Sequence, residues 1–134
     1  MSTEKKNSIT DIFGEVISSY SRKQAIEDGV LVDITELAKE AGFKYPVCIT
    51  TGVYELTQDA VNKGGKDYLG VLWDILTMLM CNIKSQKESG ARIDFTVRIW
   101  SKYTGKDALV KMYSTCGPGD NAEPVLTILL PTED

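Results

Sequence analysis

The sequence contains no histidine among its 134 residues. This absence excludes Ser–His and Cys–His nucleophiles and every metal site that uses a histidine ligand. Cysteine is scarce too, because Cys48, Cys81 and Cys116 lie far apart within apolar segments. Their odd number and wide spacing argue against a disulfide framework or a metal site, so we expect three buried free thiols. We therefore predict no metal, no cofactor and no catalytic residue of the common types.

A basic excess and a long apolar run are also missing. The chain carries 15 Lys and Arg residues against 19 Asp and Glu residues, which gives a formal net charge of −4. General nucleic-acid binders and proteins of anionic membrane surfaces usually carry a basic excess, so we expect neither function. No apolar stretch reaches the roughly 18 residues of a membrane span, and the polar residues 1–8 do not resemble a signal peptide. We expect a cytoplasmic protein.

The composition itself is ordinary for one globular domain, with 43% hydrophobic and 25% charged residues. A chain of this length can bury one sizeable core. No internal repeat or change of composition divides it. We expect residues 1–8 to form a flexible tail and residues 9–134 to form a single globular domain.

Local signals predict a series of helices and strands. Ser21 with Gln24 and Asp33 with Glu36 fit capping boxes that begin two helices, and glycines fit the ends of helices. Period-two alternation of apolar residues predicts strands in the C-terminal half. The expected helices cover 22–28, 34–41, 51–61 and 67–88, and the expected strands cover 30–32, 47–49, 93–99, 108–113 and 125–130.

The fold class that follows is α+β. An antiparallel sheet contains the C-terminal hairpin, and several helices pack on one face of it. The apolar run Val125–Leu130 predicts a last strand that is buried on both faces and central in the sheet. The helix at 67–88 is apolar well beyond one face. We therefore expect it to be buried on two sides, and we expect a homo-oligomer.

The two strands of the hairpin have a self-consistent predicted register. A two-residue turn at Thr104–Gly105 pairs Ile99 with Val110 and Val97 with Met112, so apolar residues oppose each other on the core side. The other face of the hairpin then carries the polar and aromatic side chains.

On that face the predicted register places Arg98 directly opposite Lys111. Like charges that face each other across a sheet destabilise it. The two cations either separate in water or share an anion, and Trp100 and Tyr113 beside them offer surfaces for stacking. The second alternative predicts a site for a small anionic, nucleotide-like ligand.

The segment Cys116–Pro124 is the other candidate for function. Gly117 and Gly119 allow positive φ angles or close backbone approach, and Asp120 can fold back onto the backbone. Backbone N–H groups of this loop could form an anion-binding nest, although Pro118 has no N–H. The predicted ligand-binding residues are Arg98, Trp100, Lys111, Tyr113, Gly117, Gly119 and Asp120.

Two places in the sequence resemble a known group of proteins: Ile12–Tyr20 with Gln24–Asp33, and Cys116–Asp120 with Glu123–Val125 and Thr127–Ile128. Tyr45–Pro46 and the helix of Trp73 add to the resemblance. The group is an uncharacterised family of small proteins from plasmids, phages and other mobile elements. The similarity covers nearly the whole chain. It implies an accessory protein of a mobile element in the cytoplasm of a bacterial host, and it carries over no catalytic residue.

Three hypotheses about function follow. The leading one is a non-enzymatic accessory protein that binds and sequesters a small nucleotide-like ligand, such as a host defence signal. The alternative is an inhibitor that docks on a host or element-encoded protein through exposed aromatics and acidic helices. The third is an enzyme that uses Asp120 and Glu123 as acid and base. They predict, respectively, ligand capture, a stable complex with a macromolecule, and turnover.

Overall fold

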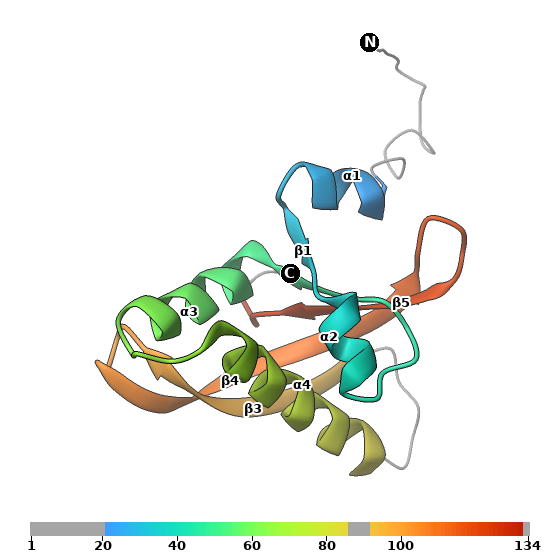
Figure 1. Ribbon diagram of the computed structural model, residues 1–134. Coiled ribbons are helices and arrows are strands. Elements are labelled where there is room, and N and C mark those ends of the chain that lie inside the picture. Colours follow the sequence, from blue (N-terminus) through green and yellow to red (C-terminus); the bar gives the residue numbers. More distant parts are fainter. Residues whose placement is uncertain (1–20, 86–91, 133–134) are drawn as a thin grey trace.

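The computed structural model of the protein describes residues 21–85 and 92–132 (Figure 1). The expected tail at 1–8 and the predicted end of the long helix at 86–88 lie outside these residues. The described elements are α1 (Arg22–Glu27), β1 (Leu31–Asp33), α2 (Thr35–Glu40), β2 (Val47–Thr50), α3 (Thr51–Asn62), α4 (Tyr68–Ser85), β3 (Arg92–Ser101), β4 (Lys106–Pro118) and β5 (Pro124–Leu129).

The helices begin largely where the local signals place them. The Ser21 and Thr50 hydroxyls accept hydrogen bonds from N–H groups in the first turns of α1 and α3. These bonds satisfy donors that a helix leaves open at its start. α2 differs from the prediction, because its N-cap residue is Ile34 and not Asp33. The Asp33 carboxylate still accepts a hydrogen bond from the Thr35 N–H, at 2.9 Å.

The strands form one five-stranded sheet in the order β1-β2-β5-β4-β3. β5 is central, as its apolar sequence predicts. The pairing of β2 with β5 is parallel and the other pairings are antiparallel, so the sheet is mixed rather than purely antiparallel. Parallel neighbours need a long crossover connection, and α3, α4 and the β3–β4 hairpin supply it between β2 and β5. The α+β class is confirmed.

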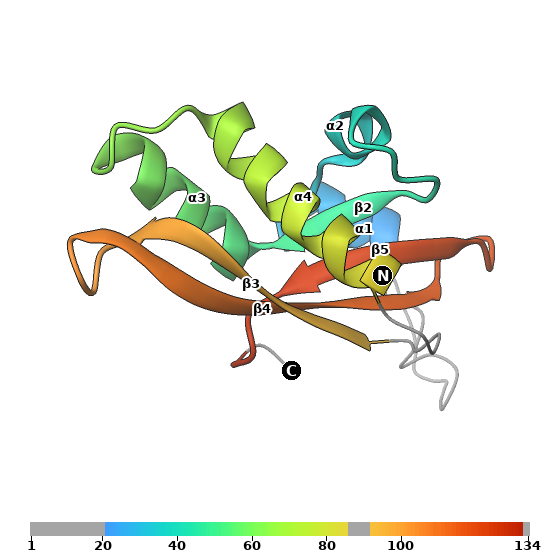
Figure 2. The same ribbon diagram turned by 90° about the horizontal axis from the view of Figure 1, so that it is seen from below.

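Helices α2, α3 and α4 lie over the same face of the sheet (Figure 2). α4 packs on β3 and also contacts α2 and α3. Its side chains Ile75, Leu76 and Leu79 are fully buried in the main core. Leu69 and Trp73, on the same helix, are exposed, which leaves part of the apolar surface of α4 outside the core.

The β3–β4 hairpin has a different register from the predicted one. Ile99 pairs with Ala108, two residues away from its predicted partner. The turn contains the four residues Lys102–Gly105, and it is closed by a hydrogen bond in which the Gly105 N–H donates to the Ser101 carbonyl at 2.8 Å. A shift of two residues leaves every side chain on its predicted face, because alternate residues of a strand share a face. Only the partners across the hairpin change.

β4 continues beyond its predicted end as far as Pro118. Gly117 lies opposite Val125 and Pro118 lies opposite Pro124. The residues Cys116–Pro118, which the sequence assigned to a loop, are therefore strand, and the connection between β4 and β5 is short.

Candidate functional site

The two cations of the predicted site do not face each other. Arg98 lies opposite Leu109, and Lys111 lies opposite Thr96. Arg98 and Lys111 are diagonal neighbours on one face of the sheet, which corresponds to a Cα separation of roughly 7–8 Å. The prediction that Arg98 lies directly opposite Lys111 is therefore wrong. Without that opposition, the register no longer implies that an anion binds between the two side chains.

Arg98 and Trp100 do line one cleft, of about 280 Å³, between α4 and β3. Lys66, Asp74 and Asp107 also line it. The Lys66 Nζ lies 3.6 Å from an Asp107 carboxylate oxygen. Lys66 comes from the loop before α4, and no local sequence pattern connects this loop to β3. For this reason the sequence gives no sign of a second cation in the cleft that Arg98 lines.

Trp100 is fixed in place by the loop that follows α3. Gly64 approaches it so closely that a Cβ at position 64 would lie 2.7 Å from the Trp100 Cγ. The indole is half-buried and packs against the main core. A fixed aromatic side chain at the wall of a cleft is suited to stacking on a flat ligand.

The predicted aromatic partner Tyr113 is only 4% exposed. The Arg92 guanidinium carbon lies 3.8 Å from the centre of its ring, so a cation–π contact already covers one face of the phenol ring. Lys111 is exposed on β4, and neither Lys111 nor Tyr113 lines the cleft of Arg98 and Trp100. The structure thus separates the two halves of the predicted hairpin site.

The glycine-containing loop is farther away still. Leu109, opposite Arg98, is near the start of β4, and Gly117 is near its end. Eight residues of strand span roughly 26 Å at about 3.3 Å per residue. Gly117 and Gly119 are not among the described glycines with positive φ, and the left-handed residue of this loop is Ala122, with φ 65°. The structure does not bring this loop to Arg98.

Asp120 has a structural partner in α1. Its two carboxylate oxygens accept hydrogen bonds from the backbone N–H groups of Arg22 and Lys23, at 2.7 and 3.0 Å. The Glu123 carboxylate accepts one from the Asn121 N–H, at 2.9 Å. These contacts satisfy open donors of α1 and of the loop. Both carboxylates therefore have a structural role in this loop, and the contacts do not depend on the acid and base roles of the third hypothesis.

A second cleft, of about 350 Å³, lies between α1 and the sheet, and Cys48 lines it beside Arg22. Cys48 is 1% exposed. Burial raises the pKa of its thiol, an effect that the nearby Arg22 guanidinium opposes in part. Cys81 and Cys116 are exposed, so the expectation of three buried thiols holds for Cys48 alone.

A third concave surface lies between α2 and the start of α4, with a volume of about 360 Å³. We call it the α2–α4 groove. Its acidic side is formed by Asp33, Glu36 and Glu40, and its apolar residues are Ile34, Leu37, Tyr68, Leu69 and Leu72. Leu69 is 57% exposed. One turn farther along α4, Trp73 is exposed as well.

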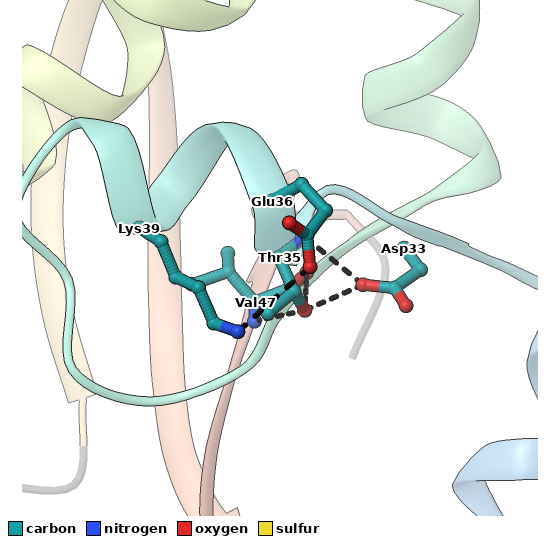
Figure 3. A network of polar contacts seen from close by, with 5 residues as sticks. All are labelled: Asp33, Thr35, Glu36, Lys39 and Val47. Atoms are coloured by element: carbon teal, nitrogen blue, oxygen red, sulfur yellow. Dashed lines mark hydrogen bonds and ion pairs between the residues drawn. The ribbon is translucent and has the colours of Figure 1, made fainter.

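The acidic side of the α2–α4 groove is anchored to the sheet through Thr35 (Figure 3). The Thr35 hydroxyl donates to an Asp33 carboxylate oxygen at 2.5 Å and accepts from the Val47 N–H of β2 at 3.2 Å. Lys39 lies 3.8 Å from the Glu36 carboxylate, and both side chains are solvent-exposed, so this ion pair contributes little. The hydrogen bonds of Thr35 fix the start of α2 against β2, while the Glu36 carboxylate remains exposed to solvent.

The described residues define an α+β protein with a mixed five-stranded sheet. The chain belongs to a family described as "Family of unknown function (DUF6573)", whose model matches residues 10–134. The resemblance to an uncharacterised family is thereby confirmed. No curated protein and no solved structure matches the chain. Within residues 21–85 and 92–132, no helix is long and apolar enough to cross a membrane.

Proposed function

We propose that this protein acts by binding another protein, through the α2–α4 groove. The observation that supports the proposal is the exposed Leu69 of α4, set against the acidic residues Glu36 and Glu40 of α2 in the groove, with the exposed Trp73 one turn farther along α4. Exposed apolar side chains gathered beside charged ones are typical of interaction surfaces. In a bacterial host, a module of this kind would inhibit a host protein or one encoded by a mobile element.

The chemistry of the groove selects the kind of partner segment. Burying an exposed leucine and a neighbouring tryptophan removes apolar area from water, at about 25 cal/mol per Å². The carboxylates favour Lys or Arg on the partner and exclude acidic segments, because like charges repel. A short amphipathic helix with basic residues on one side and leucine-sized residues on the other fits both demands.

Selection from a random peptide library displayed on phage tests this function. We expect enriched peptides to combine Lys or Arg with large apolar residues. Their affinity, measured by fluorescence anisotropy, should fall about tenfold or more for Leu69→Glu and for the double variant Glu36→Lys/Glu40→Lys. The first variant removes the apolar contact, and the second removes the attraction to basic residues of the peptide. Affinity should also fall with added salt.

Matched controls exist on other surfaces of the chain. Leu109 and Glu55 are exposed residues on β4 and α3, so Leu109→Glu and Glu55→Lys should bind the selected peptides like the unchanged protein. Enrichment of acidic peptides, or equal binding by the groove variants and the controls, would rule the groove out as the binding surface.

Capture of a small anionic ligand is the second candidate, and the cleft between α4 and β3 favours it. Arg98 and Trp100 line this cleft together with Lys66, and no carboxylate of the described residues forms an ion pair with Arg98. In one cleft, the Arg98 guanidinium can bind a phosphate group and the Trp100 indole can stack on a nucleobase. Such capture would sequester a nucleotide-like signal without turnover.

Thermal-shift measurements with cyclic nucleotides, dinucleotides and ADP-ribose test the second candidate. A ligand at about one hundred times its Kd should stabilise the protein by about 2.7 kcal/mol. The shift should disappear in Arg98→Gln and persist in Lys111→Gln, because Lys111 lies outside the cleft. No shift with any compound, or equal loss in both variants, would remove the cleft from consideration.

A further inference from the structure

The strand β3 ends the sheet on one side. It is ten residues long, Arg92–Ser101, and its outer edge pairs with no strand of the described chain. An edge of this length presents a row of backbone N–H and C=O groups that can extend a sheet into a second molecule.

The charged side chains of β3 specify a partner. When two copies of this strand are laid antiparallel about a two-fold axis at Thr96, Asp94 of each copy lies opposite Arg98 of the other copy. A two-fold interface contains each contact twice, so the edge offers two ion pairs. On the helix side of the sheet, Phe95 of each copy lies opposite Val97 of the other. Charge and apolar character therefore match in a single register.

Other self-registers lack this match. A centre at Phe95 places Arg92 opposite Arg98 of the second copy, and a centre at Asp94 or at Arg98 places that charge opposite itself. Like charges directly opposite each other destabilise a strand pair. A centre at Val97 aligns as many residues as one at Thr96 but places Asp94 opposite Trp100, so it forms no ion pair. Registers centred nearer the ends of the strand align fewer residues.

The side chains of Asp94 and Arg98 are accessible for ion pairs with a second copy. Arg98 and Asp94 are exposed, and no described carboxylate pairs with Arg98. The Asp94 Oδ1 accepts hydrogen bonds from Arg92 at 3.1 and 3.3 Å. Both contacts use Oδ1, and the Oδ2 atom forms no hydrogen bond or ion pair with another described residue, which leaves it open to a second guanidinium. We infer that two copies of this chain pair antiparallel through β3 and join their five-stranded sheets into one continuous sheet.

This pairing goes beyond the protein-binding role and uses a different surface from the α2–α4 groove. Asp94 lines neither that groove nor the cleft of Arg98 and Trp100. Variants at Asp94 therefore report on self-pairing alone, and Leu69→Glu should leave the oligomeric state unchanged.

The test is the oligomeric state of the full chain, by sedimentation equilibrium and native mass spectrometry. We expect a dimer. Asp94→Arg sets arginines against arginines and Arg98→Asp sets aspartates against aspartates, so each variant alone should raise the dimer Kd at least about a hundredfold. Mixed in equal amounts, the two variants should form a heterodimer, because both cross-strand pairs then have opposite charges again.

Two further samples complete the test. The double variant Asp94→Arg/Arg98→Asp should dimerise by itself, and Lys111→Glu, a charge reversal on the inner strand β4, should dimerise like the unchanged protein. Circular dichroism checks that each variant is folded. An unchanged protein that stays monomeric at about 100 μM overturns the inference, and so does a dimer that both single variants preserve. A mixture that fails to form the heterodimer overturns this register.

Discussion

Replacing Leu76 by alanine is expected to lower the free energy of unfolding by about 3 kcal/mol, within the range of roughly 2–5 kcal/mol for a buried leucine. Leu76 is fully buried on α4, in the layer between the helices and the sheet. Its neighbours Ile75 and Leu79 are fully buried as well. Because close-packed side chains relax only partly into the space that is left, the loss includes a cavity in addition to lost burial. Urea unfolding followed by circular dichroism measures the change.

The matched control is an exposed leucine. Leu109 is 67% exposed on β4, so Leu109→Ala should change the free energy of unfolding by less than about 0.5 kcal/mol. Equal effects of the two substitutions would contradict the position of α4 in the core.

Replacing Gly64 by alanine is expected to cost about 2 kcal/mol, in the range of roughly 1–3 kcal/mol for a methyl group forced into a packed site. The new Cβ would lie 2.7 Å from the Trp100 Cγ and 2.8 Å from the Ala60 carbonyl oxygen. Neither atom is the free end of a flexible side chain, so the loop after α3 or the β3 strand has to move. The substitution therefore also disturbs the cleft that Trp100 lines.

Gly117→Ala supplies the control for Gly64→Ala. No atom lies within 4 Å of a Cβ built at Gly117, and Gly117 is a strand residue without a positive φ. The change should leave the unfolding midpoint in urea nearly unaltered. A Gly64→Ala protein as stable as Gly117→Ala would show that the loop and Trp100 are farther apart than described.

The groove and the edge strand make separable contributions to any function. Leu69 and the acidic residues of α2 belong to one surface, and Asp94 belongs to the other. A protein that loses peptide binding in Leu69→Glu and keeps its dimer, and that loses its dimer in Asp94→Arg and keeps peptide binding, would support both proposals independently.

The sequence by itself determined the α+β class and the approximate positions of the helices and strands. Ser21 begins a helix because its own side-chain oxygen accepts a hydrogen bond from an N–H group of the first turn. The apolar run Val125–Leu130 forms the central strand, as predicted, because apolar residues favour a position inside the sheet. The predicted burial on both faces is only partly observed, since Thr127 and Leu129 are half-buried. These signals are local, and each can be read from a few neighbouring residues.

Only the tertiary structure decided the partners across the sheet and the composition of the clefts. A shift of two residues keeps the same faces apolar, so the alternation in β3 and β4 fits both the predicted and the observed register. Asp120 accepts a hydrogen bond from the Arg22 N–H of α1, 98 residues earlier in the sequence. Lys66 and Arg98 line the same cleft although no sequence pattern joins them. Such contacts depend on how whole elements pack, and packing is a property of the assembled core that no local stretch of sequence contains.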